Sequence, residues 1–327
     1  MEELIEIDGS ILEGGGQILR LAMSFSSLLK KNIKINRIRA GRSKGGLGPQ
    51  HLKGYYILSI GLIIQIALPI ALFGSSVSTL RLKGGTNADM APPIDHTVNV
   101  FLPILKKFGG NCGCSVLRRG YFPKGGGEVE LNISPVASLS SVSLTKFGSV
   151  VHIWGRSYVA GILPINMAHE MADAANHILK KIITSRIQIN IERVKESPKD
   201  AFGNGSGIVC VFNILFAETD TGCILGGSAV GARNVSTKDV GNKAALELVT
   251  AIQGEYCVDQ YTQDQIIILM ALANGKSVVK CGPITLHTKT AIYIAEKMTQ
   301  AKFKLHENET EAGLLECDGI GLRNNYR

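Results

Sequence analysis

The chain has 327 residues, of which 45% are hydrophobic, enough for one large or two ordinary domains with substantial cores. Its net charge of +8 suits a polyanionic partner such as RNA, DNA or a phosphorylated ligand, and equally suits ordinary solubility. The seven cysteines form no Cys-x-x-Cys pair, which argues against a zinc site and favours a reducing compartment. The acidic start "MEELIEIDGS" is unlike a secretion signal, so we expect no signal peptide.

The first fifty residues alternate strands, glycine-rich loops and helices. We predict a strand over 4–8, the loop "EGGG" over 13–16, and a helix over 17–30, where apolar residues recur at helical spacing. A strand over 33–38 and a glycine- and arginine-rich loop over 39–48 follow.

No charged residue occurs between Gly54 and Leu80. The stretch "ILSIGLIIQIALPIALFG" has the length and hydropathy of a membrane span, but Gln65, Pro69 and the Ser75–Ser76 pair weaken that reading. We expect a buried core segment and no membrane association, and membrane fractionation would test the alternative.

The strand, loop and helix order recurs twice more along the chain. The first recurrence comprises a strand at 80–85, a helix over 95–109, and strands near 115–119 and 127–133. The second comprises helices over 262–275 and from about 288, and strands at 277–281, 301–305 and 314–322. This pattern predicts an α+β fold built from repeated units rather than one doubly wound sheet.

The character of the chain changes between residues 151 and 253, which lack the triple-glycine loops of the flanking parts. Here we predict amphipathic helices over 164–182 and 235–252, and strands over 187–197 and 207–219. We therefore expect a discontinuous large domain, 1–150 and 254–327, with 151–253 as a smaller inserted α/β domain.

Two glycine-rich segments near the N-terminus suit phosphate groups. In "EGGGQILR", three glycines let backbone N–H groups approach an anion at a helix start, where Glu13 could hold a divalent metal and Arg20 could reach a phosphate. A tight strand-to-helix turn is the plainer alternative for this segment. The second segment, "RIRAGRSKGGLGPQH", places four cations within eight residues: Arg37, Arg39, Arg42 and Lys44. Its plainer alternative is a solvated basic loop.

Two features in the C-terminal third suit a nucleotide. In "DQYTQDQ", helical spacing would put Tyr261, Asp264 and Gln265 on one face, offering a ring, a carboxylate and an amide. In "GPITLHTKTAI", His287 precedes Thr288, a good helix N-cap, and the helix dipole would keep the imidazole neutral and nucleophilic. Plain helix polarity and a structural histidine remain the alternatives.

Six motifs taken together resemble the RNA 3′-terminal phosphate cyclase family, whose eukaryotic branch is nearest. They lie in family order over almost the whole chain: "EGGGQILR", "IRAGRSKGGLGPQHL", "GGTNADMAPPID", "RGYFPKGGGEV", "VDQYTQDQ" and "GPITLHTKTAI". The resemblance implies repeated βαβαββ-type units, like the C-terminal domain of initiation factor three, and a smaller insert domain.

The resemblance also implies a reaction and a partner. With ATP and Mg²⁺ or Mn²⁺, the family converts an RNA 3′-terminal phosphate to a 2′,3′-cyclic phosphodiester through a covalent histidine-AMP and an RNA adenylate. This is a ligase-class activity in RNA processing, expected in the nucleoplasm and also the cytoplasm. The implied roles are nucleophile for His287, metal for Glu13, phosphate and RNA binding for Arg20, Arg39 and Arg42, and nucleotide binding for Gln65, Pro92, Tyr261, Asp264 and Gln265.

The chain departs from the family pattern after about residue 58, where an internal segment is missing and two helix-like ends are joined directly. This leaves open an inactive splice variant. A further alternative is the non-catalytic, ribosome-biogenesis branch of cyclase-like proteins, which act in pre-rRNA processing. That branch lacks the nucleophilic histidine, so His287 favours the enzyme.

Overall fold

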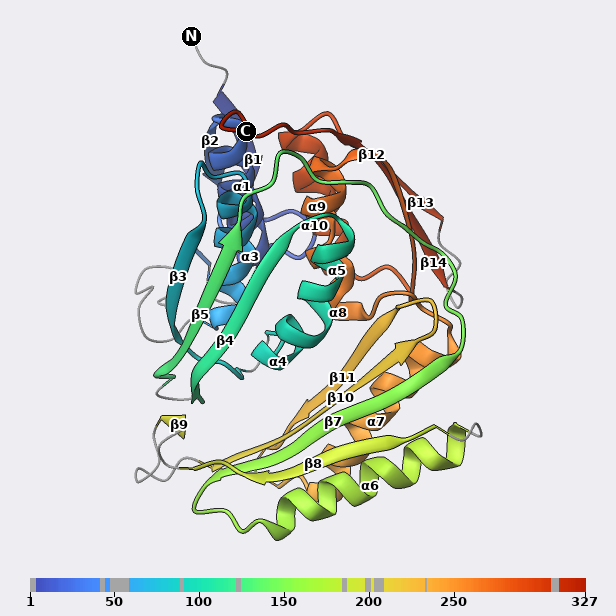
Figure 1. The fold of residues 1–327 in the computed structure, drawn as a ribbon. Helices are drawn as coiled ribbons and strands as arrows, with labels where there is room; N and C mark the ends of the chain where they lie inside the picture. The colour runs from blue at the N-terminus through green and yellow to red at the C-terminus, as the bar shows by residue number, and fades with distance from the viewer. Residues whose placement is uncertain are drawn as a thin grey trace.

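The computed structural model describes residues 4–41, 45–47, 59–88, 91–121, 125–183, 187–197, 201–202, 209–232, 234–306 and 312–327. Their strands form one two-stranded and three four-stranded sheets. Figure 1 shows an upper part, in which helices lie between two of the sheets, and a lower part, in which one sheet carries two helices. The predicted α+β class is confirmed.

The first sheet is a parallel pair, β1 (Leu4–Asp8) and β2 (Asn32–Asn36), joined through helix α1 (Gly16–Leu29). Gly14 takes a φ of +57° in the loop before α1, a conformation that glycine adopts without steric cost. The predicted strand at 4–8 is confirmed, the predicted helix is shifted by one residue, and the second strand ends two residues earlier than predicted.

The uncharged run forms helix α3 (Ile60–Leu72), which buries Ile60, Ile64, Leu68 and Leu72 in the main core. The expectation of a buried core segment is confirmed for this helix. Among the described residues, no helix is long and apolar enough to cross a membrane.

The second sheet has the strand order β3-β5-β4-β9. Between β3 and β4 the predicted single helix is interrupted, because a π-helical turn separates two α-helical segments. Pro103 follows that turn and lacks the N–H that would continue a regular ladder. The elements are β3 (Ser78–Gly84), α4 (Ile94–His96), η1 (Thr97–Phe101), α5 (Leu102–Lys107), β4 (Asn111–Gly120), β5 (Gly127–Ser134) and β9 (Ala201–Phe202).

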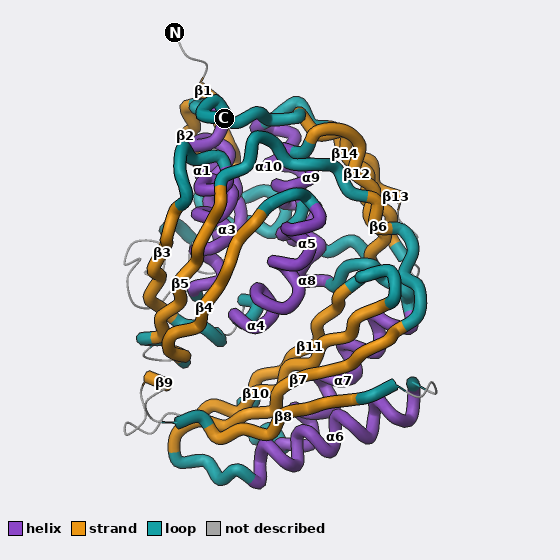
Figure 2. Tube along the Cα trace, in the orientation of Figure 1, coloured by secondary structure: helices purple, strands orange, loops and turns teal. Residues whose placement is uncertain are grey.

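The third sheet has the order β13-β14-β12-β6, and Figure 2 shows the short β6 strand beside β12. The predicted helix over 262–275 is in fact two short helices, and its last residues begin a strand instead. The elements are β6 (Ser143–Leu144), α8 (Gln260–Gln265), α9 (Ile267–Leu272), β12 (Asn274–Cys281), α10 (Leu286–Met298), β13 (Lys302–His306) and β14 (Gly313–Ile320).

The fourth sheet, in the order β11-β10-β7-β8, forms the lower part of Figure 1. The sequence indicated neither β7 nor β11; Gly226 and Gly227 give β11 a low strand propensity. We call residues 150–253 the α6/α7 unit: β7 (Val150–Gly161), α6 (Asn166–Ile182), β8 (Ile189–Lys195), β10 (Val209–Thr219), β11 (Ile224–Val230) and α7 (Thr237–Gln253).

The fourth sheet is buried on both faces. Along β10, Phe212, Ile214 and Phe216 belong to the main core, whereas Val211, Leu215 and Ala217 pack in a second cluster with α6 and α7. This alternation follows from the two-residue period of a strand, so one face of the sheet is apolar toward each cluster. The division at 151–253 into a separate folding domain stays a prediction.

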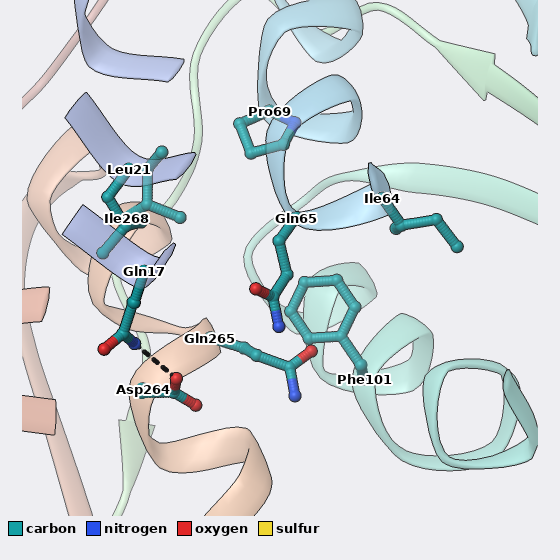
Figure 3. A pocket seen from close by; sticks show the side chains of 9 residues that line it. All are labelled: Gln17, Leu21, Ile64, Gln65, Pro69, Phe101, Asp264, Gln265 and Ile268. Atoms are coloured by element: carbon teal, nitrogen blue, oxygen red, sulfur yellow. Dashed lines mark hydrogen bonds between the residues drawn. The ribbon is translucent and has the colours of Figure 1, made fainter. Parts of the chain in front are cut away.

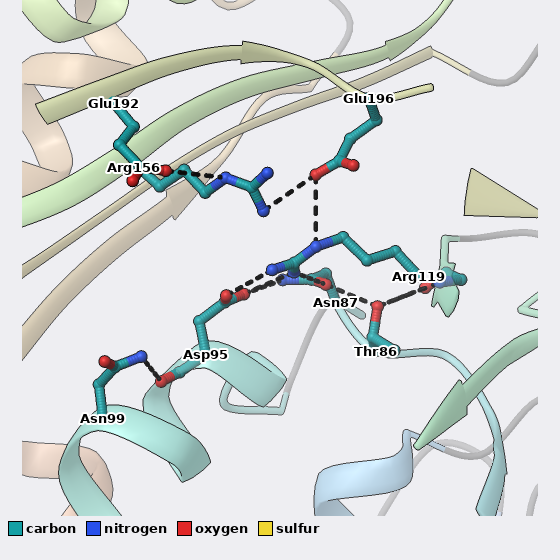
Figure 4. Close-up of polar contacts among 9 residues, drawn as sticks. Thr86, Asn87, Asp95, Asn99, Arg119, Arg156, Glu192 and Glu196 are labelled. Atoms are coloured by element: carbon teal, nitrogen blue, oxygen red, sulfur yellow. Dashed lines mark hydrogen bonds and ion pairs between the residues drawn. The ribbon is translucent and has the colours of Figure 1, made fainter. Parts of the chain in front are cut away.

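Ion pairs buried between the upper part and the α6/α7 unit also join them (Figure 4). Arg119 of β4 contacts Asp95 of α4 at 2.6 Å and Glu196, just after β8, at 3.3 Å. Glu196 in turn contacts Arg156 of β7 at 3.1 Å. Breaking a buried pair by removing one partner leaves an uncompensated charge, so this cluster fixes how the two parts meet.

Candidate active site

His287 lies in the first turn of α10. The helix begins at Leu286, and its N-cap is Thr285, whose hydroxyl accepts a hydrogen bond from the N–H of Thr288 at 3.1 Å. The predicted cap at Thr288 is therefore three residues too late. The side chain of Gln263 fixes this start, since its Oε1 accepts from the Thr285 N–H at 2.9 Å and from the Thr288 hydroxyl at 2.6 Å.

The loop before α1 brings Glu13 against His287. The Nδ1 atom of His287 lies 3.1 Å from Oε2 of Glu13, and the His287 side chain is 57% exposed while that of Glu13 is 15% exposed. A Cβ at Gly15 would lie within 2.3 Å of the Glu13 carboxylate, so only glycine there leaves room for it. The triple-glycine loop thus has a steric task besides any contact with phosphate.

This contact sets the proton chemistry of His287. The hydrogen bond to Glu13 outweighs partial desolvation and raises the pKa of His287 above its usual value. The helix dipole was expected to disfavour the imidazolium, whereas the nearby carboxylate shifts the pKa in the opposite direction. In the neutral ring, a proton on Nδ1, the nitrogen that faces Glu13, leaves the lone pair of Nε2 as the nucleophile.

Asp264 lies near this pair, at the floor of a small cavity (Figure 3). Its carboxylate accepts a hydrogen bond from Nε2 of Gln17 at 2.5 Å. Burial raises the pKa of Asp264 to about 6, although the charges of His287 and Arg20 act in the opposite direction. Burial therefore makes the ionised form of this carboxylate less favourable than it is for an exposed aspartate.

The cavity joins α1, α3 and α8. Its volume of about 20 Å³ has room for about one water molecule. At its edge Arg20 donates from Nε to Oε1 of Gln65 at 3.0 Å, and burial lowers the pKa of Arg20. The lining residues are Gln17, Leu21, Ile64, Gln65, Pro69, Phe101, Asp264, Gln265 and Ile268.

The proposed nucleotide residues are spread over several elements. Asp264 and Gln265 of α8 and Gln65 of α3 line the cavity, whereas Tyr261 lies against the ring of His96. Pro92 precedes α4 and lies close to α3. A Cβ added at Gly61 would lie 3.2 Å from the Pro92 carbonyl, and Gly61 is one helical turn before Gln65 in α3.

Arg39 and Arg42 belong to the loop after β2. Arg39 takes a φ of 54° and donates from Nη1 to the carbonyl of Gly46 at 3.3 Å. Arg42 lies outside the described residues. Among the described residues, Arg39 is not one of those that line the cavity that Arg20 borders.

A divalent metal fits this site only with help from a substrate. The described residues contain no group of three His, Cys, Asp or Glu side chains placed to hold a metal. Mg²⁺ usually takes one or two carboxylates and completes its shell with water and substrate phosphates. Glu13, beside the exposed face of His287, suits the carboxylate role.

Sequence reasoning missed two glutamines of this site. Gln17 lies in the first turn of α1, one turn before Arg20, so its helical spacing from Arg20 was a usable signal for its place in the site. Gln263 lies on the buried face of α8, and its role depends on a helix start 22 residues later, which no local pattern reveals.

The chain is similar to known proteins over nearly its full length. The family model described as RNA 3′-terminal phosphate cyclase matches residues 11–58 and 53–305. A protein of that name from Drosophila melanogaster is 38% identical, covering 98% of each chain, and one from Pyrobaculum aerophilum is 33% identical, covering 97% of this chain and 99% of its own. A probable one from Dictyostelium discoideum is 37% identical, covering 96% and 82%.

These matches also locate the missing segment. The alignment with the Drosophila protein spans 358 positions and covers 98% of the 327 residues of the chain, so at least 31 of its positions have no residue of this chain. The family model matches in two pieces that meet at residues 53–58, where the sequence had indicated a direct join.

Proposed function

The chain belongs to the RNA 3′-terminal phosphate cyclase family, and we propose that it uses ATP to convert an RNA 3′-terminal phosphate into a 2′,3′-cyclic phosphodiester. The observation that carries this proposal is the contact between Glu13 and His287. It leaves Nε2 of an exposed imidazole free to attack, as nucleophilic catalysis requires.

Each bond change has a place in this mechanism. Nε2 of His287 attacks the α-phosphorus of ATP, the N–P bond forms, and the bond to pyrophosphate breaks. The Nδ1 proton stays between the ring and Glu13, which offsets the positive charge on the ring. An oxygen of the RNA 3′-phosphate then attacks the adenylate phosphorus as the N–P bond breaks. The 2′-OH next attacks the phosphorus of the 3′-phosphate, loses its proton and displaces AMP, which completes the 2′,3′-cyclic phosphodiester.

The residues around the cavity would bind the nucleotide. Asp264, Gln265 and Gln65 line the cavity with a carboxylate and two amides, and Tyr261 and Pro92 are candidates for contact with the base. Arg20, Arg39 and Arg42 would bind phosphates of ATP and RNA. Mg²⁺ or Mn²⁺ at Glu13 would neutralise phosphate charge. This role places the protein in RNA processing, and we propose the nucleus as its site of action.

The break at residues 53–58 supports a second candidate, a shortened form that keeps the nucleophile but has lost activity. It differs from the first candidate in whether the adenylation step still occurs.

The test is adenylation without RNA. The protein is incubated with α-labelled ATP and Mg²⁺ or Mn²⁺, and we expect acid-labile label on the denatured chain, lost in His287→Ala. The matched control is His177→Ala, since His177 is exposed on α6 and remote in sequence from every site motif. Equal label on wild type and His287→Ala would refute the nucleophile, and no label on wild type would favour the inactive form.

A further inference from the structure

A buried histidine that the mechanism does not use lies beside α8. His96, the last residue of α4, is 2% exposed, and its Nε2 lies 2.9 Å from Oδ2 of Asp259, which is also 2% exposed. Asp259 is the N-cap of α8, the helix that carries Tyr261 and Asp264. The pair therefore lies directly behind the proposed nucleotide-binding face.

The hydrogen bonds of Asp259 fix the role of His96. Oδ1 accepts from the N–H groups of Tyr261 at 3.1 Å and Thr262 at 2.8 Å, and Oδ2 accepts from the N–H of Gly226 at 2.8 Å. Burial disfavours the charged carboxyl, yet His96 and these donors hold the pKa of Asp259 below its usual value. Because Asp259 is an ionised acceptor, the proton in the contact with His96 is on Nε2.

The ring of Tyr261 is held by the same group of residues. Its centroid lies 5.7 Å from that of His96 at an interplanar angle of 79°, an edge-to-face contact. Nε2 of Gln265 donates to the Tyr261 carbonyl at 2.6 Å. On the other side, burial and the nearby charge of Glu247 on α7 raise the pKa of the Tyr261 hydroxyl.

Two of the residues that contact Asp259 or Tyr261 belong to the α6/α7 unit, Gly226 of β11 and Glu247 of α7. Gly226 of β11 donates to Asp259, and a Cβ at that position would lie 2.8 Å from Cδ2 of His96. Glycine at 226 is therefore what lets β11 approach the pair. The nucleotide-binding helix is thus supported by α4 on one side and by the α6/α7 unit on the other.

We propose that His96 and Asp259 are a positioning pair that holds the Tyr261 ring where the base of the nucleotide binds, and that β11 completes this support. The inference rests on the proposed function, because it names what orients one of the proposed nucleotide contacts. Neither residue touches the reacting atoms, so loss of His96 should weaken nucleotide binding more than it slows phosphorus chemistry.

The test compares three variants in the adenylation assay as ATP is varied. His96→Leu removes the donor at nearly constant volume, and we expect about tenfold more ATP for half-maximal labelling, with the rate at saturation within about twofold of wild type. His96→Gln keeps an amide donor near the position of Nε2, and should remain within about twofold of wild type throughout. His177→Leu, on the exposed face of α6, is the matched control and should have no effect.

A binding measurement separates this inference from the mechanism. In a His287→Ala background, which cannot be labelled, calorimetric titration with ATP should show the same weakening in His96→Leu and the same rescue by Gln. If the Leu variant does not fold, His96→Asn replaces it, because its shorter amide does not reach Asp259. Normal labelling with unchanged ATP dependence in His96→Leu or His96→Asn would overturn this inference alone. A wild-type chain that neither binds ATP nor is labelled would overturn the proposed function and this inference with it.

Discussion

The β1–β2 sheet and the β12–β14 sheet begin alike and end differently. Each contains a parallel pair, β1 with β2 and β6 with β12. On its other edge β12 carries β14, which carries β13, whereas among the described strands β2 pairs with β1 alone. The first sheet thus resembles the third without its outer hairpin.

The burial of the strands records the same difference. In β12, Ser277, Val279 and Cys281 are buried, whereas no residue of β2 is, and Ile33 and Ile35 are only half-buried. The family match breaks at 53–58, after β2, where a hairpin following the β12–α10–β13–β14 order would lie. The break in the family match thus coincides with the sheet that has fewer described strands, and the strands that lead into the site, β1 and β12, are both present.

Restoring the missing segment should have the largest effect. We expect the segment of the Drosophila protein, inserted at 53–58, to raise the free energy of unfolding by about 3–5 kcal/mol, because new strands would bury Ile33, Ile35 and their neighbours. Urea denaturation measures this. A glycine- and serine-rich insert of equal length is the control and should give no gain. An unchanged unfolding midpoint with the native segment would contradict the comparison.

Matched truncations in the two sheets should differ. Leu315 of β14 is fully buried, so Leu315→Ala should cost about 2–5 kcal/mol, whereas Ile35→Ala on half-buried β2 should cost less than about 2 kcal/mol. Urea midpoints of the two variants measure the gap. Equal losses of stability would mean that β2 is buried as completely as β14, and would contradict the difference between the two sheets.

The smallest effect concerns a contact that joins the two regions, since Glu13 follows β1 and His287 follows β12. Glu13 raises the pKa of His287, so adenylation by the neutral ring should rise with pH through a midpoint above the usual value of 6.5. In Glu13→Gln that midpoint should move to lower pH, even though the maximal rate falls. The pH profile of the labelling rate measures this. An unchanged midpoint would show that Glu13 does not affect the pKa of His287.

Much of the upper part was predictable because its patterns are local. The strand at 4–8, the helix after "EGGG" and the buried uncharged run follow from apolar spacing and glycine. Local pattern failed where a distant partner decides the structure. β11 contains Gly226 and Gly227, which disfavour a strand by composition, yet β11 needs glycine because His96 and α7 press on its two faces.

The site divides in the same way. His287, Glu13 and Asp264 were identifiable by residue type and by the family resemblance, but the contact between His287 and Glu13 was not. The cap of α10 was misplaced at Thr288 because its true determinant, Gln263, lies on another helix. The direction of the His287 pKa shift was not predictable for the same reason, since the helix dipole is visible in the sequence and the contact with the Glu13 carboxylate is not.

The exposure of His287 has a consequence for timing. A ring open enough to accept a nucleotide and then an RNA end is also open to bulk water. In the proposed cycle the N–P bond of the adenylated enzyme would therefore be exposed to hydrolysis. Productive turnover would depend on RNA binding before that bond is hydrolysed. A net charge of +8 speeds the encounter with a polyanion at low salt. The positive charge of the chain would then limit hydrolysis of the intermediate by shortening the time before RNA binds.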